Sequence, residues 1–202
     1  MMRLKGQVIL ITGAGKGAGR ALALALADRK AIIAANDITP INLDPLVLDI
    51  KSRGGECKAF IADVAKKVGV QTLVNSVLDD FGRIDALIQH ACVKPRQKLI
   101  EMDEWDWQRT LDVNLTGAFL MMQSLARVMK VQGGGSIINI AAPAVVAESN
   151  NMQRQAAYFT SMAGLAELTR QAGAELEPEG IRVKFVENLG DEYVVDQVLG
   201  WL

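Results

Sequence analysis

Near its amino terminus the chain reads Ile9-Leu10-Ile11-Thr12-Gly13-Ala14-Gly15-Lys16-Gly17-Ala18-Gly19-Arg20, a glycine-rich turn between two apolar segments. The apolar run before Thr12 predicts a buried strand, and the alanine and leucine pattern of residues 21–27 predicts a helix. Glycine lets a backbone approach a pyrophosphate closely, and the free N–H groups of a helix N-terminus attract negative charge. A glycine turn alone is a weak signal, but the order strand, turn, helix predicts a phosphate-binding site.

The composition indicates a single domain over residues 1–202 with a sizeable core. Half of the residues are apolar, and 22 Lys and Arg against 23 Asp and Glu give a formal net charge of -1. This balance, without a basic cluster, argues against a nucleic-acid partner. No apolar run is long enough to cross a bilayer, and residues 1–6 leave no room for a signal peptide, so we expect no membrane partner and a cytoplasmic location. Cys57 and Cys92 are too far apart for a metal-ligand spacing, so no metal is expected.

Short apolar runs alternate with helix-period segments along the rest of the chain. This alternation predicts an α/β fold, a Rossmann-like doubly wound parallel sheet of about six strands with helices on both faces. Further strands are expected at residues 31–35, 57–62, 86–88, 136–140 and 181–186. Helices are expected from Asp44, as an N-cap, to Gly54, and over 68–81, about 104–129, about 156–177 and 191–202.

Several spaced motifs, in this order, resemble the short-chain dehydrogenase/reductase family. They are Thr12-Gly13-x-x-x-Gly17-x-Gly19, Asp63 after the third strand, Asn114 within Asp112-Val113-Asn114-Leu115-Thr116-Gly117, Tyr158 at the start of a helix, Ala163-Gly164-Leu165, Glu175-Leu176 and Gly180-Ile181-Arg182-Val183. The resemblance covers nearly the whole chain up to about Val186. It implies hydride exchange between a nicotinamide dinucleotide and a carbonyl or alcohol.

The resemblance also implies which residues bind the dinucleotide. These are Thr12, Gly13, Lys16, Gly17, Ala18, Gly19, Asp37, Asp63, Val64 and Ala91. Asp37 ends the second strand about 20 residues past the glycines, where a carboxylate accepts hydrogen bonds from the adenosine ribose and repels a 2′-phosphate. Lys16 favours NADP instead, but a mobile lysine should count for less, so NAD is the expected cofactor. In the family Asp63 contacts the adenine and Val64 packs beside it; the alternative for Asp63 is a helix N-cap.

The catalytic positions depart from the family. Tyr158 and Asn114 occupy the positions of the acid/base tyrosine and of the asparagine that seats a relay water, but Met162 and Ala142 replace the lysine and the serine. An unperturbed phenol has a pKa near 10, so roughly one molecule in a thousand is ionised at pH 7. An ammonium stabilises the phenolate and a thioether does not. The missing hydroxyl donor is worth roughly 3 kcal/mol in other enzymes. Alternatively, Tyr158 is a helix-face aromatic without a catalytic role.

Two further departures concern the fourth strand and the end of the chain. The family usually has Asn-Asn-Ala-Gly where this chain has Gln89-His90-Ala91-Cys92, so the Cys92 side chain should crowd the cofactor. His90 and Cys92 alternate along an expected strand and so could form a catalytic pair, although a structural histidine and an inert cysteine are the commoner outcome. After the sixth strand the family continues with a substrate lid and a seventh strand, where this chain has one short helix. We therefore expect weak substrate positioning.

The helices at about 104–129 and 156–177 form the dimer interface in the family, so we expect a homodimer or higher oligomer through them. An apolar stripe on such helices is equally explained by packing against the sheet. Three functions stay open. The first is an NAD(H)-binding pseudoenzyme whose hydride transfer is lost or strongly weakened. The second is a working NAD(P)-dependent oxidoreductase for a small alcohol or carbonyl substrate, and the third is a cofactor-free structural dimer.

Overall fold

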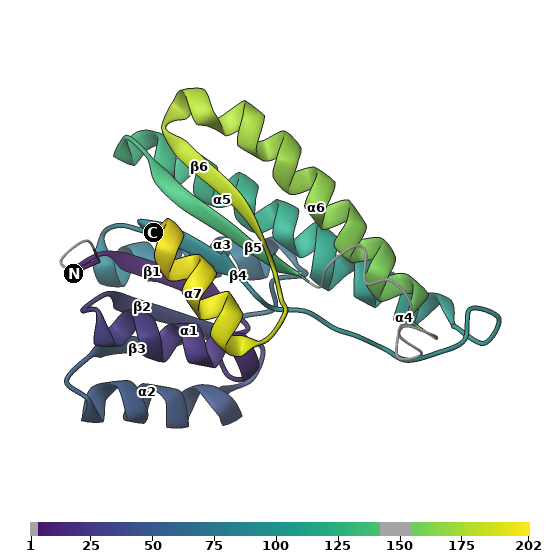
Figure 1. The fold of residues 1–202 in the computed structure, drawn as a ribbon, viewed down its shortest axis with the longest axis horizontal. Helices are drawn as coiled ribbons and strands as arrows, with labels where there is room; N and C mark the ends of the chain where they lie inside the picture. The colour runs from purple at the N-terminus through teal and green to yellow at the C-terminus, as the bar shows by residue number, and fades with distance from the viewer. Residues whose placement is uncertain (1–3, 142–154) are drawn as a thin grey trace.

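The computed structural model describes residues 4–141 and 155–202, which form one parallel sheet covered by helices (Figure 1). The six strands lie in the order β3-β2-β1-β4-β5-β6. They are β1 (Val8–Thr12), β2 (Ile32–Asp37), β3 (Glu56–Ile61), β4 (Ala86–Gln89), β5 (Gly135–Ala141) and β6 (Ile181–Glu187). This order confirms the predicted doubly wound α/β sheet, and every neighbouring pair runs parallel.

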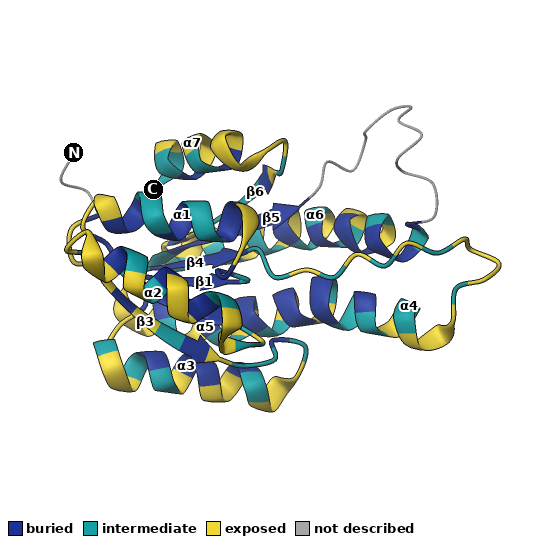
Figure 2. Ribbon diagram, turned by 90° about the horizontal axis from the view of Figure 1, so that it is seen from below, coloured by how far each residue is buried: buried dark blue, intermediate teal, exposed yellow. Residues whose placement is uncertain are grey.

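The helices cover both faces of the sheet. They are α1 (Gly17–Asp28), η1 (Pro40–Asn42), α2 (Leu43–Ser52), α3 (Lys67–Phe81), α4 (Glu104–Leu111), η2 (Asp112–Thr116), α5 (Gly117–Gln132), α6 (Ala156–Leu176), η3 (Glu177–Glu179) and α7 (Asp191–Trp201). One apolar cluster joins the sheet to α1, α2 and α7, and a second joins it to α3, α5 and α6. Figure 2 shows α1 and α7 on one side of the strands and α3 on the other.

The central strands are apolar up to their last residues, Thr12 and Gln89, because both of their faces are buried. All five residues of β1 and all four of β4 are buried. Strand order reverses between these two neighbours, since β1 continues toward β2 and β4 continues toward β5. In doubly wound sheets the crevice outside the carboxyl ends of the strands at this reversal is where ligands bind. A ligand site is therefore expected among the loops after β1, β2, β3 and β4.

The expected helix over residues 104–129 is interrupted. The chain runs through α4, then the π-helical turn η2, then α5. A π turn inserts a residue into the helix and rotates the residues after it, which sequence periodicity does not reveal. The start of α5 lies close to the loop after β3: a Cβ added to Gly117 would lie 2.9 Å from the Val64 carbonyl oxygen.

The N-cap prediction for Asp44 is wrong. α2 begins at Leu43 with Asn42 as its N-cap, two residues before the predicted one, directly after the 3₁₀ turn η1. The Thr39 hydroxyl oxygen caps η1 by accepting a hydrogen bond from the backbone N–H of Ile41, at 3.4 Å. Asp44 instead lies in the first turn of α2, where its charge still favours the helix dipole.

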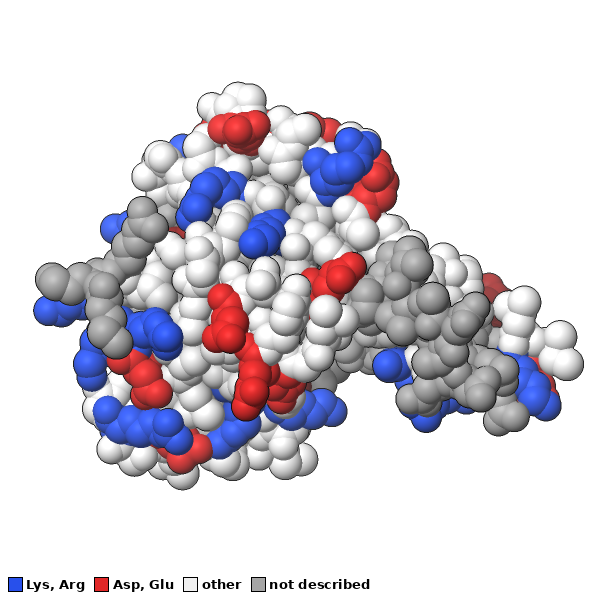
Figure 3. Space-filling model, viewed as in Figure 1, with Lys and Arg blue, Asp and Glu red and all other residues white. Residues whose placement is uncertain are grey.

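The carboxyl-terminal segment packs on the sheet. Val194 and Val198 of α7 are fully buried in the same cluster as α1. The Arg182 guanidinium on β6 lies 4.5 Å from the ring centroid of Trp201 and so ties the end of α7 to the edge strand. On the face drawn in Figure 3, basic and acidic side chains are interspersed over the body of the molecule.

Candidate active site

The glycine turn after β1 is packed too closely for side chains. Gly13 and Gly17 have positive φ angles of 66° and 54°, which L side chains rarely adopt. A Cβ on Gly13 would lie 2.8 Å from the Cα of Ala91, and one on Gly19 would lie 2.3 Å from the carbonyl oxygen of Gly13. The glycines therefore let the turn, α1 and the loop after β4 meet at one point.

The amino end of α1 lies at this point without a side-chain cap. Lys16 is the N-cap residue, and no side chain in the described part of the chain bonds there. The Arg20 N–H bonds back to the Lys16 carbonyl oxygen at 3.3 Å, so the N–H groups of Gly17, Ala18 and Gly19 precede the first turn of helical bonds. Such N–H groups, together with the helix dipole, suit a phosphate.

Thr12 is buried and serves the protein itself. Its hydroxyl oxygen accepts hydrogen bonds from the backbone N–H groups of His90 and Ala91, both at 3.3 Å. This contact ties the carboxyl end of β1 to the loop after β4. The structure therefore places Thr12 in a positioning role beside the turn.

His90 is fastened to the glycine turn. Its Nδ1 lies 3.1 Å from the carbonyl oxygen of Gly13, and a Cβ on Gly19 would lie 2.7 Å from the same nitrogen. Burial lowers the pKa of His90, so the ring is neutral at pH 7 and its Nδ1–H donates to the carbonyl. This structural role of His90 was not evident from the sequence, where the residue simply stood in place of an asparagine.

His90 and Cys92 lie in the loop after β4, which ends at Gln89, so the alternation of side chains along a strand does not apply to them. Cys92 is exposed as a residue, although the packing around its sulfur raises the pKa of the thiol. A thiol with a raised pKa is a poor nucleophile at neutral pH. A neutral His90 that is already bonded to Gly13 is also not placed as its base.

A cavity of about 250 Å³ opens at the carboxyl ends of β1, β2 and β4. The structure brings six of the residues implied for dinucleotide binding to its wall. They are Gly13, Lys16, Asp37, Asp63, Val64 and Ala91. Cys92 lines it as well. Gly17, Ala18 and Gly19 lie in the adjoining first turn of α1.

Asp37 is held at the glycine turn by backbone donors. Its Oδ1 accepts from the N–H of Ile38 at 2.8 Å, and its Oδ2 accepts from the N–H of Gly15 at 3.3 Å. A Cβ on Gly15 would lie 2.7 Å from that Oδ2, so glycine is also required here. The carboxylate is thus fixed at the cavity with acceptor capacity left for hydroxyl groups.

Asp63 forms an ion pair that the sequence did not indicate. Arg109 of α4 approaches it with a distance of 3.2 Å between Nη1 and Oδ2, and both side chains are about three-quarters buried. The other oxygen of Asp63 accepts from the Ala65 N–H at 3.0 Å. The N-cap alternative for Asp63 is not borne out, because Lys66 is the N-cap of α3. Arg109 also lines the cavity, and no local pattern pointed to it.

Asn114 lies in the π turn and connects two segments. Its amide donates to the Val93 carbonyl at 2.9 Å and to the Ser161 hydroxyl at 3.0 Å, and its Oδ1 accepts from the Val93 N–H at 2.8 Å. The Ser161 hydroxyl donates in turn to the Tyr158 carbonyl at 2.7 Å. The Asn114 side chain thus fastens the loop after β4 to the start of α6.

Tyr158 lies in an apolar cluster. It is 6% exposed and packs with Ala118, Ala141, Met162 and Leu165. Met162, one helical turn further on, is 1% exposed. The Lys94 Nζ lies 4.8 Å from the centroid of the Tyr158 ring. Ala142, which occupies the serine position, lies outside the described residues.

Comparisons with known proteins agree with this geometry. A family model described as short chain dehydrogenase matches residues 7–188. The chain belongs to that family. Members of the family are oxidoreductases that use a nicotinamide dinucleotide as cofactor.

Individual relatives support the assignment. This short-chain dehydrogenase family member is 35% identical to the D-threitol dehydrogenase of Mycolicibacterium smegmatis over 184 residues, which are 91% of the chain and 70% of that relative. It superposes on an NAD+-bound xylitol dehydrogenase with a TM-score of 0.85 and 33% identity, covering 92% of this chain and 70% of that one. A metagenomic short-chain oxidoreductase in complex with NADP gives a TM-score of 0.90 at 28% identity, with coverages of 98% and 90%. Neighbours thus include complexes with both forms of the dinucleotide.

Membrane spans and metal clusters are both absent from the described part of the chain. Over residues 4–141 and 155–202, no helix has both the length and the apolar character needed to cross a bilayer. Within the same ranges, no three His, Cys, Asp or Glu side chains group as they would around a metal ion.

Proposed function

We propose that this chain binds NAD(H) and that its hydride-transfer activity is strongly weakened relative to other members of its family. The observation that carries the proposal is the surroundings of Tyr158, where the neighbour one helical turn on is the buried thioether of Met162. A thioether cannot stabilise a phenolate as an ammonium does. The cavity at the carboxyl ends of the strands, by contrast, keeps the features that suit a dinucleotide. These are the glycine turn, the uncapped N-terminus of α1 and the Asp37 carboxylate held by backbone N–H groups.

The chain's own groups fit such a cofactor. A bound nicotinamide dinucleotide supplies the hydride acceptor or donor. The N–H groups at the start of α1 would hold the pyrophosphate, and Asp37 would accept hydrogen bonds from the adenosine ribose. Tyr158 would exchange a proton with the substrate oxygen through its hydroxyl, and Asn114 would orient Tyr158 through Ser161.

NAD rather than NADP is proposed because of charge. The Asp37 carboxylate lies at the end of β2, fixed by two backbone N–H groups, and would repel a 2′-phosphate. Lys16 is exposed and attracts phosphate, but no side-chain contact holds it in one place among those described. A fixed charge discriminates between NAD and NADP more strongly than a mobile one, because no entropy is lost in ordering its side chain when the cofactor binds.

Calorimetric titration with NAD+, NADH and NADPH tests the binding half of the proposal. We expect NAD+ and NADH to bind and NADPH to bind at least tenfold more weakly. No heat with any of them would favour a cofactor-free dimer instead. A screen of small alcohols and carbonyl compounds, followed by NADH absorbance, tests the weakened activity.

Restoring the family residues sharpens the test. We expect Ala142→Ser combined with Met162→Lys to raise turnover by less than about tenfold, because a new ammonium at a 1% exposed position has a desolvation cost. Met162→Leu, of similar volume, is the matched control. A rise of a hundredfold or more would show that those two side chains are all that the site lacks.

A working NAD(P)-dependent oxidoreductase is the second candidate, and one observation favours it. An amine from another part of the chain, that of Lys94, lies beside the Tyr158 ring. The relatives named above include dehydrogenases of small polyols, so threitol and xylitol are sensible first substrates. Robust turnover that disappears in Tyr158→Phe would establish this candidate over the first.

We also propose a homodimer through α5 and α6. A groove of about 400 Å³ runs between these helices. Its apolar wall includes Phe119, Met122, Ala126, Leu168, Ala172 and Leu176. Phe119 is 42% exposed, which is unfavourable in an isolated subunit. Sedimentation of the wild type and of Phe119→Asp, which should be monomeric, tests the proposal.

A further inference from the structure

Lys94 stands in the loop after β4, and its position is set by its neighbours. Val93, directly before it, is bonded through both its N–H and its carbonyl to the side chain of Asn114. Pro95, directly after it, restricts Lys94 to an extended backbone. The backbone from which the Lys94 side chain extends is therefore held in place.

The same hydrogen bonds fix Tyr158 relative to this stretch. Asn114 donates to Ser161, and Ser161 donates to the Tyr158 carbonyl. Asn114 and Ser161 are 2% and 0% exposed, so water does not compete for these bonds. A continuous polar connection thus sets the loop carrying Lys94 against the helix carrying Tyr158.

The amine meets the face of the ring. Lys94 Nζ lies 4.8 Å from the centroid of the Tyr158 ring, within the range of a cation–π contact. The apolar cluster that contains Tyr158 also includes Ala118 of α5 and Ala141 of β5, with Leu115 of η2 and Phe185 of β6 packed against it. From α6 itself, Phe159 contacts the ring edge-on at a centroid distance of 5.4 Å. The ring is 6% exposed whereas Lys94 is exposed, so the effective dielectric between the charge and the ring lies between that of water and that of the protein interior.

We infer that Lys94, in the loop after β4, supplies the positive charge that favours the ionised form of Tyr158. Met162, one helical turn after Tyr158, carries no charge and cannot supply it. A phenolate spreads its negative charge over the ring as well as the oxygen, so an ammonium over the ring face stabilises it. The inference deepens the proposed function, since it names the group on which residual proton transfer at Tyr158 depends. Lys94 acts through Tyr158 and is a positioning residue.

The test reads the phenol directly, in protein without dinucleotide. The chain has two tyrosines, so Tyr193→Phe leaves Tyr158 as its one phenol. Tyr193 is 41% exposed and tolerates the loss of its hydroxyl. Alkaline titration of the near-ultraviolet tyrosinate band then gives the pKa of Tyr158, and the further change Tyr158→Phe must abolish the signal.

Three variants in that background separate charge from packing. Lys94→Met keeps the length of the side chain and removes the charge, so we expect the Tyr158 titration midpoint to rise by about one pH unit or more. Lys94→Arg keeps the charge and should leave the midpoint near its original value. Lys98→Met removes an exposed lysine of the same loop, paired with Glu101, and should change nothing.

A midpoint in Lys94→Met equal to that in Lys98→Met would overturn the inference, and so would a Tyr158 that does not ionise before the protein unfolds in alkali. A merely structural cation–π contact would lower the unfolding temperature in Lys94→Met without moving the phenol midpoint. Because no cofactor is present, the result stands apart from the calorimetric test of dinucleotide binding. Failure of one does not imply failure of the other.

Discussion

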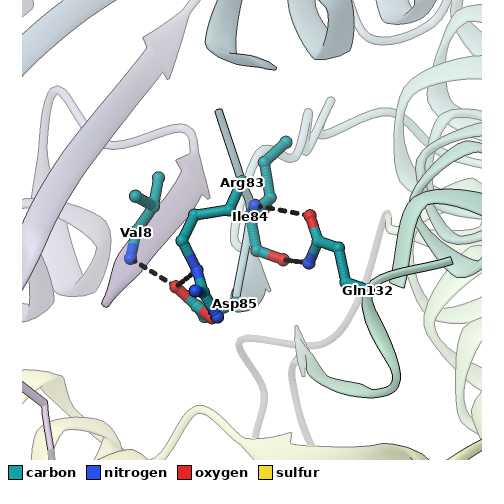
Figure 4. A network of polar contacts seen from close by, with 5 residues as sticks. All are labelled: Val8, Arg83, Ile84, Asp85 and Gln132. Carbon is teal, nitrogen blue, oxygen red and sulfur yellow. Dashed lines mark hydrogen bonds and ion pairs between the residues drawn. The ribbon is translucent and has the colours of Figure 1, made fainter. Parts of the chain in front are cut away.

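The two ends of β1 and β4 differ in how backbone polar groups are satisfied. At the amino ends, side chains form hydrogen bonds with backbone groups of Val8 and Ile84. At the carboxyl ends, α1 begins without a side-chain cap. Figure 4 shows the amino end, where the Asp85 carboxylate accepts from the Val8 N–H at 2.8 Å. The Gln132 amide there accepts from the Ile84 N–H at 3.1 Å and donates to the Ile84 carbonyl at 3.0 Å.

At the carboxyl end Thr12 and Asp37 also accept hydrogen bonds from backbone N–H groups, but glycines bring the backbone segments together there and α1 begins without a side-chain cap. Removing the Cβ lets backbone meet backbone, as at Gly19, and leaves N–H groups at the cavity. We therefore expect the polar side chains at the amino end to contribute mainly to folding stability, and the uncapped N–H groups at the carboxyl end to contribute mainly to the proposed dinucleotide binding. Substitutions at the two ends should separate these two properties.

Gly19→Ala should have the largest effect, because its Cβ would lie 2.3 Å from the Gly13 carbonyl oxygen. We expect a loss of roughly 3 kcal/mol in the free energy of unfolding, together with loss of NAD+ binding. The matched control is Gly200→Ala in α7, where nothing lies within 4 Å of the new methyl group. Urea unfolding and calorimetry measure both; equal stabilities of the two variants would contradict the close packing.

Asp85→Ala should lower stability and spare binding. It removes the acceptor of the Val8 N–H and the partner of Arg83, whose Nε lies 3.0 Å from Oδ1. We expect a loss of about 2 kcal/mol in the free energy of unfolding, because a backbone donor loses its partner. Asp79→Ala, at an exposed position on α3, is the control. A tenfold change in NAD+ affinity for Asp85→Ala would break the separation between the two ends.

Asp37→Ala should affect binding more than stability. Without the carboxylate we expect NADH to bind about tenfold more weakly and NADPH to bind more tightly. The free energy of unfolding should fall by only about 1 kcal/mol, because the N–H groups of Gly15 and Ile38 lose their acceptor but the Ile38 N–H lies where water can replace it. The exposed Asp44 in the first turn of α2 provides the control Asp44→Ala. Unchanged relative affinities for the two cofactors would remove Asp37 from the binding site.

The pH dependence of stability should show a smaller effect, at the chain's one histidine. Burial lowers the pKa of His90 in the folded protein, so below the ordinary pKa of about 6.5 the unfolded chain binds a proton that the folded chain does not. Stability should therefore fall as pH falls from about 7 to about 5.5, by up to roughly 1 kcal/mol more than in His90→Asn. Urea midpoints at several pH values measure this, and parallel pH curves would contradict it.

Much of the fold could be predicted from the sequence because it rests on local patterns. Apolar runs ending at Thr12 and near Asp37 marked strands within one or two residues of β1 and β2. The helix expected over 68–81 does end at Phe81, and Gly82 follows it in the left-handed conformation. Where a local signal had a competitor, as at Asp44 beside the 3₁₀ turn η1, the predicted N-cap was two residues from the observed one, Asn42.

The candidate site was only partly predictable, for a physical reason. The spacing of the glycines and the polar residues that follow each strand predicted several residues that line the cavity. They could be predicted because the carboxyl ends of the strands of a parallel sheet lie at one edge. The pairing of Asp63 with Arg109, 46 residues apart, depends on how α4 lies against the sheet. The contact between Lys94 and Tyr158 likewise depends on the π turn and on the packing of α6.

The sequence by itself thus determined the strand, the glycine turn and the helix at the start of the chain, because each is a local property of the chain. Only the tertiary structure decided which charge lies beside the phenol, because helix packing brings those two side chains together.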